Sequence, residues 1–364
     1  MKVLVWQWGR RGAGPLCAVA FARELARAGA ATELCLSAQS ELVATGAAPA
    51  GTWTEPTYDG VASLLARLAG APFAVRRLAR RIAAMAPDVA LCAMPAALDL
   101  LMVAALRRAG VPFAVTIHDA DPHPGETWLI QMRLQRALAR RADAVVALSS
   151  HVAVRLAQQG VFGRQLVIRT PLPPLTERAA PPPFAHGGVP RLLCFGRLLP
   201  YKGLDLLAGA MRAVPEGAVA LRVVGTGPEG PELAALRALP GTVVENRWVP
   251  EQEVADLLAW ADALVLPYRE ASQSGVAAAA LAMGRFVIAT RVGGIPEQLA
   301  AQALARVVEP DAASIAGAIS TFAAERPAAL PAAGYDVETL LSGLRSIARV
   351  RGSRSAAPRA PARR

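Results

Sequence analysis

The stretch PLPPLTERAAPPPFAHGGVPRLLCFGRLLPYKG, residues 171–203, decides the fold, because it divides the chain into two halves of the same kind. Seven prolines fall between residues 171 and 190, and they preclude regular structure because proline lacks a backbone donor and fixes its own φ angle. An apolar strand at residues 191–195 follows at once and leads into a loop rich in Gly, Arg and Lys. We therefore expect an interdomain linker at residues 173–190 and a second domain that begins at residue 191.

Both halves alternate short apolar runs with Ala-rich and Leu-rich helical patterns, which predicts parallel sheets covered by helices. At 364 residues the chain is also too long for one ordinary core. We predict an α/β protein with two Rossmann-like domains facing across a cleft, at residues 1–172 and 191–333, then a C-terminal helix at 334–349 and a disordered basic tail at 350–364. The expected strands lie at residues 2–6, 31–37, 88–93, 112–117 and 144–148 in the first half, and at 191–195, 220–224, 242–245, 263–266, 286–289 and 306–308 in the second.

Composition and charge narrow the classes of function. The formal net charge of +11 indicates attraction to something anionic, such as nucleic acid, an acidic membrane surface or phosphorylated ligands. Nucleic-acid binding is not expected, because the sequence has neither a basic stretch interleaved with aromatic residues nor zinc-ligand spacing. The four cysteines stand singly in apolar stretches and are expected to be reduced core residues.

The sequence favours a cytoplasmic protein. Its apolar runs fall short of the roughly 20 residues that a bilayer span needs, and the first residues predict a strand rather than an export signal. Four arginines between residues 76 and 81 share one predicted helix with Phe73, Leu78 and Ile82. We favour a solvated arginine-rich face for this helix, and peripheral contact with acidic lipid at the inner face of the membrane is the alternative.

Two glycine-rich loops follow predicted strands. In the first half, Gly12, Ala13 and Gly14 leave room for a ligand to approach the backbone, and the next helix offers unpaired donors to an anion; a tight turn that requires glycine is the alternative. In the second half, Gly-x-Gly-x-x-Gly spans residues 225–230, but Pro228 removes one donor and the motif opens the second unit of its domain. We therefore favour a loop lining a nucleotide cleft over a dinucleotide fingerprint.

Polar residues cluster after the strand at residues 112–117, namely His118, Asp119, Asp121 and His123. An Asp-x-Asp pair can hold a divalent metal against a diphosphate, whereas the neighbouring prolines also fit a rigid turn. We favour the turn and expect no metal. His118 comes first after the strand and is predicted to contact substrate, with a structural histidine as the alternative.

Two loops of the second half carry charge and polarity at strand ends. Arg197 and Lys202 lie between a strand and a helix, where they can converge on one diphosphate and neutralise the charge that grows on a departing nucleotide. Solvated surface cations are the alternative. The loop at residues 267–276 opens an Ala-rich helix, and its Ser and Gly amides can receive a phosphate or sugar hydroxyls, with simple N-capping as the alternative.

These motifs together resemble family 4 retaining glycosyltransferases, which have the GT-B fold. The resemblance rests on Gly-Arg-x4-Lys from residue 196, Gly-x-Gly-Pro-Glu from residue 225, the loop at 267–276 and Val-Gly-Gly-Ile-Pro-Glu at 292–297. It covers nearly the whole chain and is most specific in the second half. It implies a nucleotide-diphosphate sugar donor, transfer with retention at the anomeric carbon, no catalytic metal and no cofactor.

The resemblance also implies residue roles. Arg197 and Lys202 would grip the diphosphate, and His118 would reach the donor sugar, so these three are the predicted catalytic residues. Arg247 and Trp248 would lie where the family's loop meets the base. The full set of predicted donor-binding residues is Gly12, Gly14, Gly196, Gly227, Arg247, Trp248, Glu270, Ser272, Gln273, Ser274, Gly275 and Val276.

One departure from the family pattern concerns the second glutamate of its motif, which holds the ribose and would fall at Ala278 or Ala279. Another ribose contact, a subgroup with a Ser-Gln-Ser-Gly loop, or a weakened enzyme would each account for the missing carboxylate. We favour the subgroup, because the loop is otherwise coherent.

The predicted function is hexosyl transfer to a glycan or lipid-linked acceptor in polysaccharide or glycolipid synthesis. The alternatives are a non-catalytic relative that binds nucleotide sugars and a nucleotide-sugar epimerase of the same fold.

Overall fold

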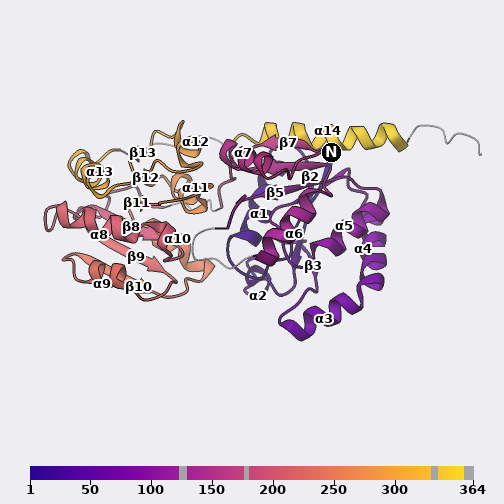
Figure 1. Ribbon diagram of the computed structural model, residues 1–364, viewed down its shortest axis with the longest axis horizontal. Helices are drawn as coiled ribbons and strands as arrows, with labels where there is room; N and C mark the ends of the chain where they lie inside the picture. The colour runs from indigo at the N-terminus through magenta and orange to yellow at the C-terminus, as the bar shows by residue number, and fades with distance from the viewer. Residues whose placement is uncertain (123–128, 176–179, 329–334, 356–364) are drawn as a thin grey trace, which may run out of the picture.

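The chain folds into two α/β units, which lie side by side along the long axis of the molecule (Figure 1). The computed structural model describes residues 1–122, 129–175, 180–328 and 335–355. Each unit is built on one sheet whose described strand pairs are all parallel. The expected α/β class with two parallel sheets is thus confirmed.

The first sheet has seven strands in the order β3-β2-β1-β4-β5-β6-β7. They are β1 (Lys2–Gln7), β2 (Ala31–Ser37), β3 (Trp53–Glu55), β4 (Val89–Cys92), β5 (Phe113–Ile117), β6 (Ala144–Ala147) and β7 (Leu166–Arg169). The sequence did not predict β3 or β7. β3 has three residues, and β7 is an edge strand whose Leu166 and Val167 are exposed, so neither presents the continuous apolar run of a buried parallel strand.

The second sheet has six strands in the order β10-β9-β8-β11-β12-β13. They are β8 (Arg191–Phe195), β9 (Ala220–Gly225), β10 (Thr242–Asn246), β11 (Ala263–Leu266), β12 (Phe286–Thr290) and β13 (Ala305–Val308). In both sheets the chain reverses its direction of travel once, between β1 and β4 and between β8 and β11. Ligands of open parallel sheets bind outside the carboxyl ends of the strands at such a reversal.

Helices connect the strands. In the first unit they are α1 (Ala13–Arg27), α2 (Glu41–Ala44), α3 (Val61–Ala69), α4 (Ala71–Met85), α5 (Asp99–Ala109), α6 (Leu129–Ala139) and α7 (Ser150–Gln158). In the second they are α8 (Leu204–Ala213), α9 (Pro231–Arg237), α10 (Glu251–Trp260), α11 (Gly275–Ala282), α12 (Ile295–Leu299) and α13 (Ala312–Glu325), with a short 3₁₀ turn at Pro200–Lys202. No helix among the described residues is both long and apolar enough to cross a bilayer.

The end of the proline-rich segment is fastened to the second sheet by one buried carboxylate. Asp262, at the start of β11, accepts hydrogen bonds from the backbone of Phe184 at 2.6 Å and of Arg191 at 2.7 Å. His186 Nε2 lies 2.9 Å from the same side chain. Because three partners share one carboxylate, residues 184–191 are held against the domain that they introduce.

The last described helix, α14 (Val337–Ser355), packs on the first unit although it follows the second in sequence (Figure 1). It contacts β7, β4, β6 and α1, and Leu340, Leu341 and Leu344 are fully buried in the first unit's core. The helix runs six residues beyond the predicted start of the basic tail at 350, so residues 350–355 are helical. Residues 356–364 of that tail lie outside the described residues, as does His123.

Leu344→Ala should lower the free energy of unfolding by about 2–4 kcal/mol, because it empties a fully buried site between α14 and the first sheet. Urea unfolding followed by circular dichroism measures the change. The exposed Ser346→Ala on the same helix is the matched control. Equal midpoints for the two variants would contradict docking of α14 in solution.

Candidate functional site

A cavity of about 590 Å³ lies between the two units. Its walls come from the loops that follow β1, β5, β8, β9, β10 and β11 and from the first turns of α1, α10 and α11. The loops after β1, β8 and β11 are those at the two points where the sheets reverse direction. The cavity therefore sits where parallel sheets of this topology bind ligands.

The structure brings nine of the fifteen predicted site residues together on this cavity. These are Gly12, Gly196, Arg197, Lys202, Trp248, Gln273, Ser274, Gly275 and Val276. The other six, His118, Gly14, Gly227, Arg247, Glu270 and Ser272, are not among its lining residues.

Lys202 and Arg197 bring positive charge to the cavity wall from the loop after β8. The Lys202 ammonium lies 3.8 Å from the centroid of the Tyr268 ring, and the Arg197 guanidinium lies 5.6 Å from the centroid of the Tyr201 ring. Among the described residues no carboxylate lies within ion-pair distance of Lys202. Burial accordingly lowers the pKa of Lys202, and an anion in the cavity would restore the stabilisation that water gives this charge in solution.

A close backbone contact sets the position of Lys202. Gly203 has a φ of +66°, and a Cβ at this residue would lie 1.9 Å from the carbonyl oxygen of Pro267. Only glycine fits both the left-handed conformation and the contact. The loop after β8 can therefore pack directly on the loop after β11, which carries Tyr268.

Two helix N-termini add partial positive charge. α1 begins at Ala13 after Gly12, and α11 begins at Gly275, and both starts line the cavity. Ser274 caps α11, because its Oγ accepts a hydrogen bond from the amide of Ala277 at 3.2 Å; the capping interpretation of this serine is confirmed. The first amides of a helix lack intrahelical partners and favour anions, so these ends reinforce the charge of Arg197 and Lys202.

His118 and Ser272 have structural contacts instead of a place on the cavity wall. His118 is buried at the end of β5, where its Nε2–H donates to the carbonyl of Ala93 at 2.9 Å. Burial lowers the pKa of His118, so the ring is neutral at pH 7. The carbonyl of Ser272 accepts a hydrogen bond from Ser149 Oγ at 3.1 Å, which ties the second unit to the first.

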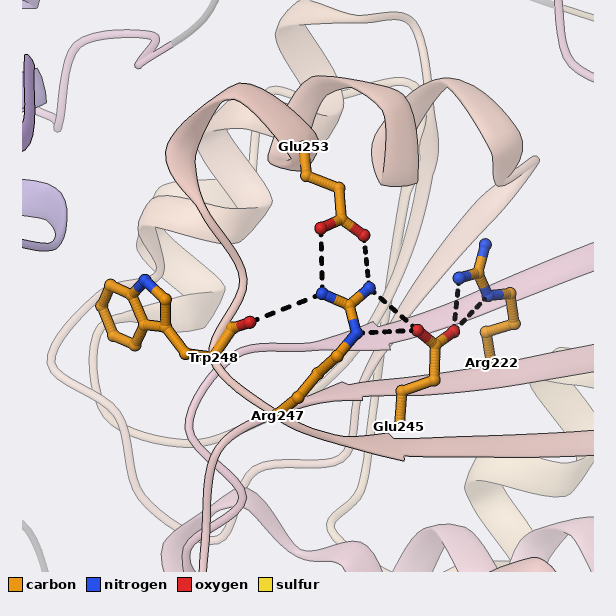
Figure 2. A network of polar contacts seen from close by, with 5 residues as sticks. All are labelled: Arg222, Glu245, Arg247, Trp248 and Glu253. Carbon is orange, nitrogen blue, oxygen red and sulfur yellow. Dashed lines mark hydrogen bonds and ion pairs between the residues drawn. The ribbon is translucent and has the colours of Figure 1, made fainter. Parts of the chain in front are cut away.

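Arg247 is not among the lining residues, and its side chain belongs to an ion-pair network; its predicted place beside the base stays a prediction. It pairs with Glu245 at the end of β10 and with Glu253 in the first turn of α10, and Arg222 holds Glu245 from the far side (Figure 2). These contacts raise the pKa of Arg247 further above its usual range. Its Nη1 also donates to the carbonyl of Trp248 at 3.4 Å, so Arg247 holds the loop that carries the indole.

The glycines at 14 and 227 serve internal packing. A Cβ at residue 227 would lie 2.0 Å from the carbonyl oxygen of Leu198, and one at residue 14 would lie 2.5 Å from Gln7 Nε2. Both glycines allow site loops to close on their neighbours, so their part in the site is indirect.

Asp119 and Asp121 have separate surroundings. Asp119 lines the cavity, whereas Asp121 receives hydrogen bonds from Arg155 at 2.9 Å and from Gln159 at 2.7 Å. Within the described part of the chain, no group of three His, Cys, Asp or Glu residues is placed to hold a metal ion.

Sequence reasoning missed Glu251, the first residue of α10, which lines the cavity. Burial, and then the nearby carboxylate of Glu41, raise the pKa of Glu251 to about 7. The amide of Glu251 lies 3.4 Å from Glu41 Oε1, across the interdomain boundary. The sequence offered no distinct signal, because a glutamate in the first turn of a helix is ordinary.

Family models match each unit of the chain. Residues 14–171 match the family model described as glycosyl transferase 4-like domain, and residues 189–325 match the one described as glycosyl transferases group 1. Both descriptions are of glycosyltransferases, which agrees with the resemblance found in the motifs of both units.

The chain is similar to mannosyltransferases. It is 28% identical over 216 residues, 52% of this chain and 53% of the relative, to a GDP-mannose:glycolipid 4-beta-D-mannosyltransferase of Xanthomonas campestris pv. campestris. It is 32% identical over 260 residues, 63% of this chain and 66% of the relative, to a GDP-mannose-dependent alpha-(1-6)-phosphatidylinositol monomannoside mannosyltransferase of Mycolicibacterium smegmatis. The chain thus spans about half to two thirds of the curated relatives that it matches.

Solved structures share the fold. Anabaena HepE in complex with UDP and glucose aligns with a TM-score of 0.65 at 18% identity, over 97% of this chain and 95% of that one. Sucrose-phosphate synthase of Thermosynechococcus elongatus aligns with a TM-score of 0.60 at 17% identity, over 97% and 98%. The predicted GT-B fold, two Rossmann-like domains with parallel sheets, is confirmed.

Replacing Glu251 with Gln should stabilise the fold at pH 8 and not near pH 4.5. The pKa of about 7 in the folded chain lies above the ordinary glutamate value of 4.5, so the folded state favours the protonated acid and loses stability as the pH rises through 7. We expect a gain of about 1–3 kcal/mol at pH 8 for Glu251→Gln, measured by denaturant unfolding at several pH values. The exposed Glu216→Gln is the control. A pH-independent difference would contradict the shifted pKa.

Proposed function

We propose that this protein transfers a sugar, with retention of anomeric configuration, from a nucleotide-diphosphate sugar to a lipid-linked or glycan acceptor. The observation that supports it is the convergence of Arg197, Lys202 and the N-termini of α1 and α11 on one interdomain cavity. This arrangement complements a diphosphate, whose negative charge grows as the glycosyl bond breaks. GDP-mannose is the proposed donor, because both relatives are named for it, and a glycolipid is the proposed acceptor, because the Xanthomonas relative is named for one.

The proposed chemistry needs neither a metal nor a cofactor, because cationic side chains and helix ends supply the charge that would otherwise come from a divalent ion. Retention is proposed from the motif resemblance. An epimerase of the same fold would alter the donor without an acceptor, and a non-catalytic relative would bind the donor without turnover. The mannosyltransferase names of the sequence relatives favour transfer over both.

Arg197→Ala and Lys202→Ala should each lower kcat/KM, because each removes a charge that faces the leaving diphosphate. The loss of transition-state stabilisation in each variant should be about 2–4 kcal/mol. The assay supplies GDP-mannose and a lipid-linked glycan acceptor, with and without EDTA, and NMR reports the anomeric configuration of the product. Arg212→Ala, an exposed cation on α8, is the control. Turnover equal to the wild type in both site variants would refute the assignment.

Peripheral contact with an acidic membrane forms part of the proposal, and the structure refines its surface. α3 has no buried residue, and Val61, Leu65 and Leu68 are exposed on it. Phe73, at the start of α4, is 75% exposed. Exposed apolar side chains beside a basic helix are suited to the interface of an anionic bilayer.

The arginines of α4 divide into two pairs. Arg77 pairs with Glu55, and Arg81 lies 4.3 Å from the centroid of the Trp53 ring, so both also contact their own domain. Arg76 and Arg80 are exposed on the same helix. Leu78 and Ile82 are buried and hold α4 on the first unit. The proposed membrane surface therefore consists of Val61, Leu65, Leu68, Phe73, Arg76 and Arg80.

Leu65→Asp combined with Phe73→Asp should abolish flotation of the protein with vesicles that contain phosphatidylglycerol, because it places charge where apolar contact is expected. Neutral phosphatidylcholine vesicles should bind the wild type several-fold more weakly. Val243→Asp, at an equally exposed apolar position on β10, is the matched control. Flotation that persists in the double variant would exclude this surface.

A further inference from the structure

We infer that Glu251 and Trp248 form the nucleoside end of the donor site and select guanine; the inference rests on the proposed donor function. Both residues line the cavity, and both belong to the segment that leaves β10 and begins α10. Neither the motifs nor the family models assign a ligand to Glu251.

Two walls of the cavity differ in the charge of their lining residues. The lining residues of the segment 248–258 include one carboxylate, Glu251, and no Lys or Arg. The cations Arg197 and Lys202 come instead from the loop after β8, where they outnumber the other lining carboxylate, Asp119, which raises the pKa of Lys202. A carboxylate repels a diphosphate and attracts hydrogen-bond donors, so a bound nucleotide is expected to direct its phosphates to the β8 loop and its base to the 248–258 wall.

Glu251 is suited to accept hydrogen bonds from a ligand. Its side chain is partly buried, and among the described residues its carboxylate has no hydrogen-bond or ion-pair partner. Paired donors would favour the ionised form of Glu251 over the protonated acid that burial stabilises. An ionised carboxylate only accepts hydrogen bonds, and its two oxygens can receive two adjacent donors. The side chain therefore lacks contacts that a bound group with paired N–H or O–H donors would supply.

Guanine is the base whose edge fits. It presents N1–H and N2–H side by side, which matches two carboxylate oxygens. Uracil offers one N–H between two carbonyl oxygens that a carboxylate would repel, and adenine offers an amino group beside an acceptor nitrogen. Trp248 is 51% exposed and provides an aromatic face on which a base can stack.

The segment is held in place before any ligand arrives. Arg247 joins Glu245 on β10 to Glu253 on α10 and contacts the carbonyl of Trp248, as Figure 2 shows. In that view the indole extends away from the network. Because strand end, loop and helix start are cross-linked by one guanidinium, little ordering of this wall is needed when a base binds.

The test measures dissociation constants of GDP, IDP and UDP by isothermal titration calorimetry. IDP keeps N1–H and lacks the 2-amino group of guanine. The wild type should bind GDP at least about tenfold more tightly than UDP and more tightly than IDP. Glu251→Gln should weaken the binding of GDP by about tenfold or more and remove the difference in affinity between GDP and IDP. The dissociation constant of UDP should stay within about twofold of the wild-type value. Glu216→Gln should behave as the wild type.

Several results would overturn the inference. Equal losses for all three nucleotides in Glu251→Gln would assign Glu251 to the ribose, replacing the carboxylate absent at Ala278 and Ala279. An unchanged GDP-to-UDP ratio in Glu251→Gln, or a wild-type preference for UDP, would exclude guanine selection while the proposed transfer stands. The proposed function fails separately if Arg197→Ala binds all three nucleotides as tightly as the wild type, and both fail if the wild type binds none.

Discussion

The site depends on positive charge that converges on the interdomain cavity. Lys202 lies against the ring of Tyr268, Arg197 lies near Tyr201, and the N-termini of α1 and α11 face the same cavity. Removing a cation from water costs free energy unless an anion replaces the lost hydration. In the proposed reaction a diphosphate would replace the hydration that burial removes from Lys202. The same charge would stabilise that group more strongly as it leaves, so one arrangement would serve both binding and catalysis.

Backbone contacts make that arrangement possible. The contact of Gly203 with Pro267, and that of Gly227 with Leu198, let neighbouring loops meet without side chains between them. Residues from three strand ends thus reach one small volume at the reversal point of the second sheet. The interdomain hydrogen bonds of Ser149 with Ser272 and of Ser150 with Glu297 hold the other wall at a defined position.

Charged residues next to the cavity divide into two kinds. Glu245, Arg247 and Glu253 satisfy one another, and such partly exposed ion pairs contribute little to stability, so their effect is to fix a loop. Glu251 and Lys202 are partly buried and shifted in pKa in the directions that burial dictates. Side chains of this second kind carry a stability cost that a ligand can offset, which is typical of functional positions.

The sequence by itself determined the two parallel sheets and the cation-bearing loop, because apolar periodicity and the Arg197 to Lys202 spacing are properties of short segments. Only the tertiary structure decided that α14 completes the first unit, that Arg247 and Gly227 serve packing and positioning, and that Glu251 lines the cavity. These outcomes depend on partners far away in sequence. Glu251 lies near Glu41, which is 210 residues away in sequence and belongs to the other domain. A local sequence pattern does not indicate which distant groups will surround a side chain.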